Sequence, residues 1–259
     1  SKYIPHSKTL ILMIDTSVYS SDKEEFLQCF NVFLQGKKIA DGFNNALDLQ
    51  NYQNGLIMNS INDNLDNGIQ NIIIIGHHPI TGIKYKKKKN KKTGKEEEKI
   101  DTLNDIAEFT EVLNNIYNIA GNINYYYLCA DYHSYQTGEI VVQYGENTIT
   151  INQYIAGIGG TSLDHEISPE NMNRPYTIND TNYNITYIPN ENIHNWGFLV
   201  CRIKNEGVEF EPHFIDDTKI SVGGKKNIRN SKKRKTKRKI KRKTKRKTKR
   251  KTKRKTKNK

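Results

Sequence analysis

The sequence is short of the features that would place it in several common protein classes. It has three cysteines among 259 residues, too few and too scattered for a disulfide framework or a cysteine-rich zinc domain. No apolar stretch approaches the roughly 18 to 20 residues that cross a membrane, so no membrane partner is expected. The first residues show no charged segment followed by an apolar run, so a secretory signal is not expected. We expect Cys29, Cys129 and Cys201 to be buried free thiols in an intracellular, reducing compartment.

Acidic residues are missing from the end of the chain. Residues 225–259 hold 24 of the 42 lysines and arginines and no aspartate or glutamate, which leaves 18 basic against 28 acidic residues elsewhere. The net charge of +14 therefore combines an acidic body with a cationic tail. We expect a folded domain over residues 1–220. Residues 221–259, largely a Lys/Arg/Thr repeat, are expected to be disordered because they have too few apolar side chains to form a core.

The repeat in this tail is suited to polyphosphate backbones. Its charge density predicts sequence-independent binding of nucleic acid by residues 225–259, weakening steeply with salt, and it resembles a nuclear-localisation tract. The alternatives are a solubilising tail or one that folds back on the acidic body. Nucleic acid is therefore an expected partner, and the nucleus an expected location.

Hydrophobic periodicity predicts an α/β fold, with helices packed on a mixed sheet and a second sheet supplied by hairpins. The polar, proline-containing stretch 162–193 is predicted to be a long loop. The lysine-rich stretch 84–99 is predicted to be a solvated, mobile insert. Predicted strands cover 9–15, 71–75 and 124–130, predicted helices 23–34, 47–65 and 101–119, and predicted hairpins 139–154 and 197–215.

Two of these strands end in residues that can bind metals. The predicted strand 71–75 is followed by GHHP (76–79), and the predicted strand 124–130 leads into ADYH (130–133). Ligands gather beyond the carboxyl ends of strands in α/β sheets. Asp131 and His133 would project to the same side of an extended chain. Together with His77 they predict a site for Zn²⁺, Mn²⁺ or Fe²⁺. The alternative is that each side chain is simply hydrogen-bonded.

These motifs resemble the C-terminal half of the calcineurin-like metallophosphoesterases, which include the purple acid phosphatases. IIIIGHHP (72–79) is similar to the family's Gly-His-x-Pro motif, and YLCADYHSYQ (127–136) to its Gly-His-x-His motif. LILMIDT (10–16), YIAGIGGTSLD (154–164) and NWGFLVCRI (195–203) are similar to further segments in the same order. The resemblance covers about residues 9–214 and implies a four-layer α/β/β/α sandwich. It also implies phosphate-ester hydrolysis by water activated between two divalent cations, Zn, Mn or Fe.

The resemblance also implies roles for individual residues. His77 and His133 match metal ligands of the two motifs. Asp131 stands where the family has a histidine, and it suits a hard cation. His78 is expected to contact substrate phosphate, with a surface position as the alternative. No residue of this chain is assigned as a catalytic acid or base.

Three further metal-binding motifs of that family are missing. No Asp-x-His precedes His77, and neither a Gly-Asp pair nor Gly-Asn-His occurs in the chain. The family carries these motifs upstream, and the chain begins with Ser1 instead of methionine. We therefore expect the C-terminal portion of a longer phosphoesterase, inactive or weakly active by itself. The alternative is a degenerate, non-catalytic phosphatase scaffold whose basic tail binds nucleic acid.

Overall fold

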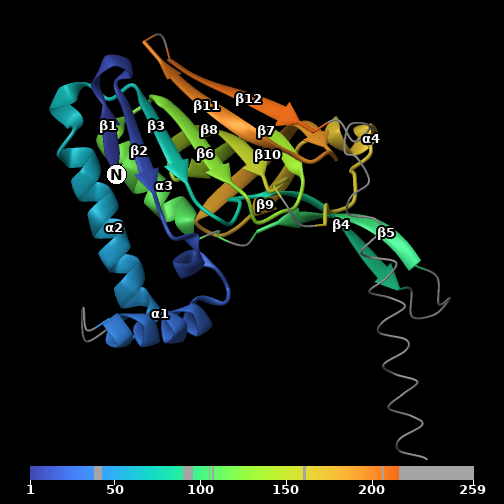
Figure 1. Ribbon diagram of the computed structural model, residues 1–259, viewed down its shortest axis with the longest axis horizontal. Helices are drawn as coiled ribbons and strands as arrows, with labels where there is room; N and C mark the ends of the chain where they lie inside the picture. The colour runs from blue at the N-terminus through green and yellow to red at the C-terminus, as the bar shows by residue number, and fades with distance from the viewer. Residues whose placement is uncertain are drawn as a thin grey trace, which may run out of the picture. The chain divides into compact units, whose positions relative to one another are not determined.

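The structure, a computed structural model, describes residues 1–37, 43–89, 96–104, 106, 108–159, 162–205 and 207–215 (Figure 1). The chain divides into two units, a larger one over Ser1–Phe214 and a smaller one over Ile215–Lys259. The repeat tail over residues 221–259, predicted to be disordered, lies outside the described residues.

Helices and strands are both present in the first half of the larger unit, and strands dominate its second half. The helices are α1 (Lys23–Lys37), α2 (Ala46–Asn62), α3 (Phe109–Ala120) and α4 (Pro169–Met172). The strands are β1 (Lys2–Ile4), β2 (Thr9–Met13), β3 (Asn71–Ile75), β4 (Gly82–Lys89), β5 (Glu96–Leu103), β6 (Asn124–Cys129), β7 (Tyr135–Tyr144), β8 (Asn147–Ala156), β9 (Tyr176–Asn179), β10 (Tyr183–Ile193), β11 (Gly197–Lys204) and β12 (Gly207–Phe214). Within the described residues, no helix has the length and hydrophobicity needed to cross a membrane.

An eight-stranded mixed sheet with the order β1-β2-β3-β6-β8-β7-β10-β9 organises the larger unit. The neighbours β2, β3, β6 and β8 are parallel, and the other pairs are antiparallel. The register pairs Met13 with Ile75, and Ile75 with Leu128. Because these residues lie at or next to the strand ends, the carboxyl ends of β2, β3 and β6 lie side by side. The segments that follow them therefore meet at one edge of the sheet.

The two faces of this sheet are covered by different elements (Figure 1). On one face, Tyr127 of β6 packs against Phe109 of α3, with ring centroids 6.1 Å apart. On the other face, Tyr126 and Tyr154 pack against Phe210 of β12 at 5.2 Å and 4.2 Å. Helices and the β11–β12 hairpin thus sandwich the sheet. The fold is mixed α/β, as the hydrophobic pattern predicts; the described residues do not establish the four-layer sandwich.

Most predicted elements are confirmed, but the loop predicted over residues 162–193 is wrong. This stretch contains β9 and β10, and β10 pairs with β7 along almost its whole length. Its register shifts between Pro189 and Glu191, which accommodates a proline that lacks an amide hydrogen. The polar residues that suggested a loop belong to strands at the edge of the sheet, where alternate side chains face solvent.

Two further predictions differ from the structure: the lysine-rich stretch 84–99, predicted as a solvated, mobile insert, forms strand over its described residues, and the helix predicted over 101–119 starts later. β4 and β5 pair as an antiparallel hairpin, and α3 begins only at Phe109. Lys86 and Asp101 form a salt bridge of 3.0 Å across this hairpin. The hydrogen bond from Lys86 lowers the pKa of Asp101. Cross-strand contacts between oppositely charged side chains favour the pairing. The hairpin is also anchored by Ile83 and Leu103, which belong to the hydrophobic core.

The cysteines are only partly as predicted. All three are free, but Cys29 and Cys201 are exposed and Cys129 alone is buried. Burial raises the pKa of the Cys129 thiol well above its usual value, so it stays protonated. The predicted burial of Cys29 and Cys201 is wrong, because each lies on an exposed side of its element.

Candidate metal centre

Backbone hydrogen bonds join the segments that follow β3 and β6. The amide of Gly76 donates to the carbonyl of Leu128 at 2.9 Å. Beyond it, the carbonyl of His77 accepts from the amides of Ala130 and Asp131 at 3.0 Å and 2.9 Å. These contacts continue the pairing of the two strands past their ends. They hold His77 and Asp131 next to each other at the edge of the sheet.

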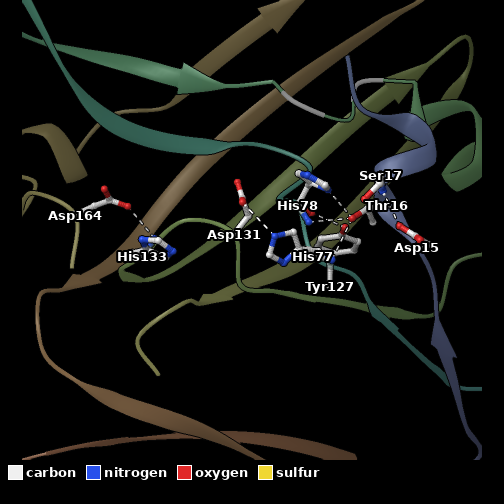
Figure 2. A network of polar contacts seen from close by, with 9 residues as sticks. All are labelled: Asp15, Thr16, Ser17, His77, His78, Tyr127, Asp131, His133 and Asp164. Atoms are coloured by element: carbon white, nitrogen blue, oxygen red, sulfur yellow. Dashed lines mark hydrogen bonds and ion pairs between the residues drawn. The ribbon is translucent and has the colours of Figure 1, made fainter. Parts of the chain in front are cut away.

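The side chains of His77 and Asp131 face one another (Figure 2). The Nε2 atom of His77 lies 3.2 Å from Oδ1 of Asp131, and the two side chains are 62% and 41% exposed. His78 joins this group: each of the three side chains offers a ligand atom within 4.8 Å of the others. The side chains of His77 and Asp131 therefore lie close together, as predicted, and His78 is the third side chain of the group.

His78 is held by two buried side chains, Thr16 shortly after β2 and Tyr127 on β6. The hydroxyl of Thr16, which follows β2, lies 2.9 Å from Nδ1 of His78 and 2.9 Å from its amide nitrogen. The hydroxyl of Tyr127 donates to the carbonyl of His78 at 2.7 Å. Burial raises the pKa of Tyr127 well above its usual value, which keeps this hydroxyl a donor. The ring and the backbone of His78 are thus both fixed.

Two glycines allow the backbone to come this close. A Cβ atom on Gly76 would lie 2.4 Å from Cγ2 of Thr16 and 2.7 Å from the hydroxyl of Tyr127. A Cβ atom on Gly157, just after β8, would lie 2.1 Å from the carbonyl oxygen of Tyr132. Both positions therefore need glycine for steric reasons. Gly76 lets Thr16 reach the two histidines, and Gly157 lets the end of β8 support the segment that carries Asp131.

His133, the third predicted metal ligand, does not join the group. Its amide donates to Oδ2 of Asp164 at 2.8 Å, and the amide of Asp164 donates to its carbonyl at 2.8 Å. Figure 2 shows this pair on the far side of Asp131 from His77. The prediction assumed an extended chain, whereas residues 131–134 form bends closed by a hydrogen bond from the Ser134 amide to the Tyr132 carbonyl at 2.9 Å. Two-residue periodicity does not apply in a turn.

The chain after His78 is held by two buried glutamines. The side chain of Gln153 accepts from the amide of Ile80 at 2.9 Å and donates to the carbonyl of Thr81 at 2.6 Å. Gln136 makes the same pair of contacts with the amide and carbonyl of Ile83, each at 3.0 Å. Each side-chain amide thus acts as a strand partner would. Together the two glutamines fix the backbone of residues 80–83, which follow the GHHP motif.

Sequence reasoning missed Thr16, Tyr127 and these two glutamines. Thr16 had a usable signal, because it follows the carboxyl end of a predicted strand just as His77 does. Gln136 and Gln153 are buried polar residues on strands, and their partners are about 50 and 70 residues away in the sequence. No local pattern identifies such a pairing.

Comparison with known proteins leaves the family open. No protein-family model matches this chain, and comparison with curated proteins and with solved structures gives no significant match. The resemblance to calcineurin-like phosphoesterases therefore remains a prediction that rests on its motifs, and the geometry of the site carries the functional argument.

Proposed function

We propose that this domain binds a divalent cation through His77 and Asp131 and acts on phosphate esters. The distance of 3.2 Å between Nε2 of His77 and Oδ1 of Asp131 carries the proposal. Two ligand atoms bound about 2.1 Å from one tetrahedral cation lie about 3.4 Å apart. The two atoms are thus already spaced for a shared ion, and both side chains are accessible to solvent.

The donor set suits Zn²⁺, Mn²⁺ or Fe²⁺, which accept imidazole and carboxylate together. A cation held there would polarise a phosphoryl oxygen and lower the pKa of a bound water. The GHHP motif and the parallel strands that present it support a phosphoesterase. They also support the four-layer sandwich as the complete fold, in which the β11–β12 hairpin would begin the second sheet.

We expect this chain alone to bind the metal weakly. Within the described residues, one group of three His, Cys, Asp or Glu side chains is close enough to share a cation. Catalytic zinc sites use three protein ligands, and a two-metal centre needs several more. Weak binding in turn predicts slow hydrolysis by the isolated chain.

Metal binding is tested by titrating the full chain with Mn²⁺ and with Zn²⁺ in a calorimeter. His77→Ala and Asp131→Asn are each expected to weaken binding at least tenfold, about 1.4 kcal/mol. The matched control is His6→Ala, which removes an exposed imidazole elsewhere in the unit and should leave binding unchanged. Equal affinities in all four proteins would show that the ion binds elsewhere. A loss in His133→Ala would restore the ligand set predicted from the sequence.

Hydrolysis of p-nitrophenyl phosphate tests the reaction itself. We expect slow turnover that requires Mn²⁺ or Zn²⁺ and disappears in His77→Ala. Metal binding without turnover above that variant would argue against a phosphoesterase and for the degenerate scaffold. Strong turnover by this chain alone would contradict the expected weakness of the site.

The second candidate function, nucleic-acid association, rests on the charge of residues 225–259, which lie outside the described residues. We expect the logarithm of the DNA affinity to fall linearly with the logarithm of salt concentration, through counterion release. Truncation after Gly224 should abolish the binding. Equal binding by the full and truncated chains in a fluorescence anisotropy titration would refute this function.

A further inference from the structure

The hydrogen bonds of Thr16 determine which nitrogen of His78 carries the proton. The Thr16 oxygen accepts from the amides of His77 and His78, at 3.1 Å and 2.9 Å. A hydroxyl has two lone pairs and one hydrogen. Both lone pairs are taken, so its hydrogen is left for the remaining neighbour, Nδ1 of His78, at 2.9 Å. Thr16 is fully buried, so solvent does not compete for these positions.

The ring of His78 must therefore accept at Nδ1. A neutral imidazole has one acceptor nitrogen and one N–H, so the proton lies on Nε2. Such a ring has no free lone pair for a metal, because the only one it has is bound by Thr16. His78 is close enough to His77 and Asp131 to be a third metal ligand, but its hydrogen bonding makes it a donor.

We propose that Thr16 is a positioning residue that holds His78 as an Nε2–H donor to an anionic oxygen, such as a phosphoryl oxygen, bound beside His77 and Asp131. The ligand class rests on the proposed function; the tautomer does not. Figure 2 shows Thr16 on one side of the His78 ring and Asp131 on the other. A donor on that side complements the negative charge of a phosphate, while His77 and Asp131 remain the metal ligands.

The surroundings of His78 make this donor rigid. Its amide, its carbonyl and its Nδ1 atom are each bound by a fully buried side chain, Thr16 or Tyr127. Donors that are fixed before the ligand arrives bind charge without reorganisation. The segment also tolerates little displacement, because Gly76 has no room for a Cβ atom between these two side chains. Thr16, which follows β2, thus fixes the position of His78, which follows β3.

Nitrogen NMR of the imidazole rings tests the tautomer directly in the full chain at pH 8. We expect the two ring-nitrogen shifts of His78 to be those of a single Nε2–H tautomer in the wild type and in Thr16→Ser. In Thr16→Val the two shifts should move toward each other, because nothing then holds Nδ1 as an acceptor and the tautomers exchange. An Nδ1–H tautomer or an exchanging mixture in the wild type would overturn the proposal, even if the valine variant fails to fold.

Two additions to the same sample test the role of the donor. Inorganic phosphate is expected to shift the Nε2–H signal of His78 in the wild type and to shift it less in Thr16→Val. Zn²⁺ should shift the ring nitrogens of His77 and leave the tautomer of His78 unchanged. No response of His78 to phosphate, or coordination of Zn²⁺ by His78, would overturn the proposal. Failure of Zn²⁺ to bind at His77 would instead refute the proposed metal centre and leave the tautomer assignment standing.

Discussion

Replacing Gly157 by alanine is expected to lower the free energy of unfolding by about 3 kcal/mol, at the upper end of what overpacking costs. The new Cβ would lie 2.1 Å from the carbonyl oxygen of Tyr132 and 2.5 Å from that of Ala130. Both are backbone atoms, so neither moves unless the segment moves. Because that segment carries Asp131, the affinity for Mn²⁺ should fall as well, although Gly157 offers no ligand atom.

Gly159→Ala is the matched control for this prediction. It lies two residues further along the same segment, and a Cβ there would meet nothing within 4 Å. We expect its stability to change by less than about 1 kcal/mol, through the entropy of the unfolded chain. Urea denaturation of the three proteins gives the comparison. Equal stability of Gly157→Ala and Gly159→Ala would show that Gly157 is not in tight contact with the carbonyl oxygens of Ala130 and Tyr132.

Replacing Gln153 by leucine should destabilise the domain by about 3 kcal/mol, because two buried backbone groups lose their partners at about 1–3 kcal/mol each. These groups are the amide of Ile80 and the carbonyl of Thr81. Ile80 and Thr81 are almost completely buried, so water does not replace the lost bonds. Leucine fills a similar volume, so packing alone predicts a much smaller effect.

Gln143→Leu provides the control, since Gln143 is exposed on neighbouring β7. It should stay within about 0.5 kcal/mol of the wild type in urea denaturation. Hydrogen exchange gives a second readout, in which the amide of Ile80 should lose protection selectively in Gln153→Leu. A Gln153→Leu protein as stable as the wild type would mean that the backbone after the GHHP motif does not depend on this side-chain amide.

Part of the candidate site could be predicted from local sequence. The run NIIII predicts a buried strand from its β-branched residues alone, and Gly76 marks its end. The next strand was predicted over residues 124–130 from the run NYYYLCA, and β6 occupies Asn124–Cys129. Because parallel strands end at the same edge of a sheet, this was enough to expect His77 and Asp131 close together. The prediction of His133 as a metal ligand failed because the chain bends after β6. His133 is then held by hydrogen bonds with Asp164, about 30 residues later in the sequence.

Sequence by itself determined where the parallel strands β2, β3 and β6 lie, which side chains follow them, and that residues 225–259 carry basic but no acidic side chains. These properties depend on a residue and its near neighbours, which the sequence contains in full. Tertiary structure alone decided three contacts: Thr16 with His78, Gln153 with the chain after His78, and His133 with Asp164 instead of the metal-ligand group. These contacts join residues 62, 73 and 31 positions apart. They arise from strand order and register, which depend on how the whole apolar surface is buried.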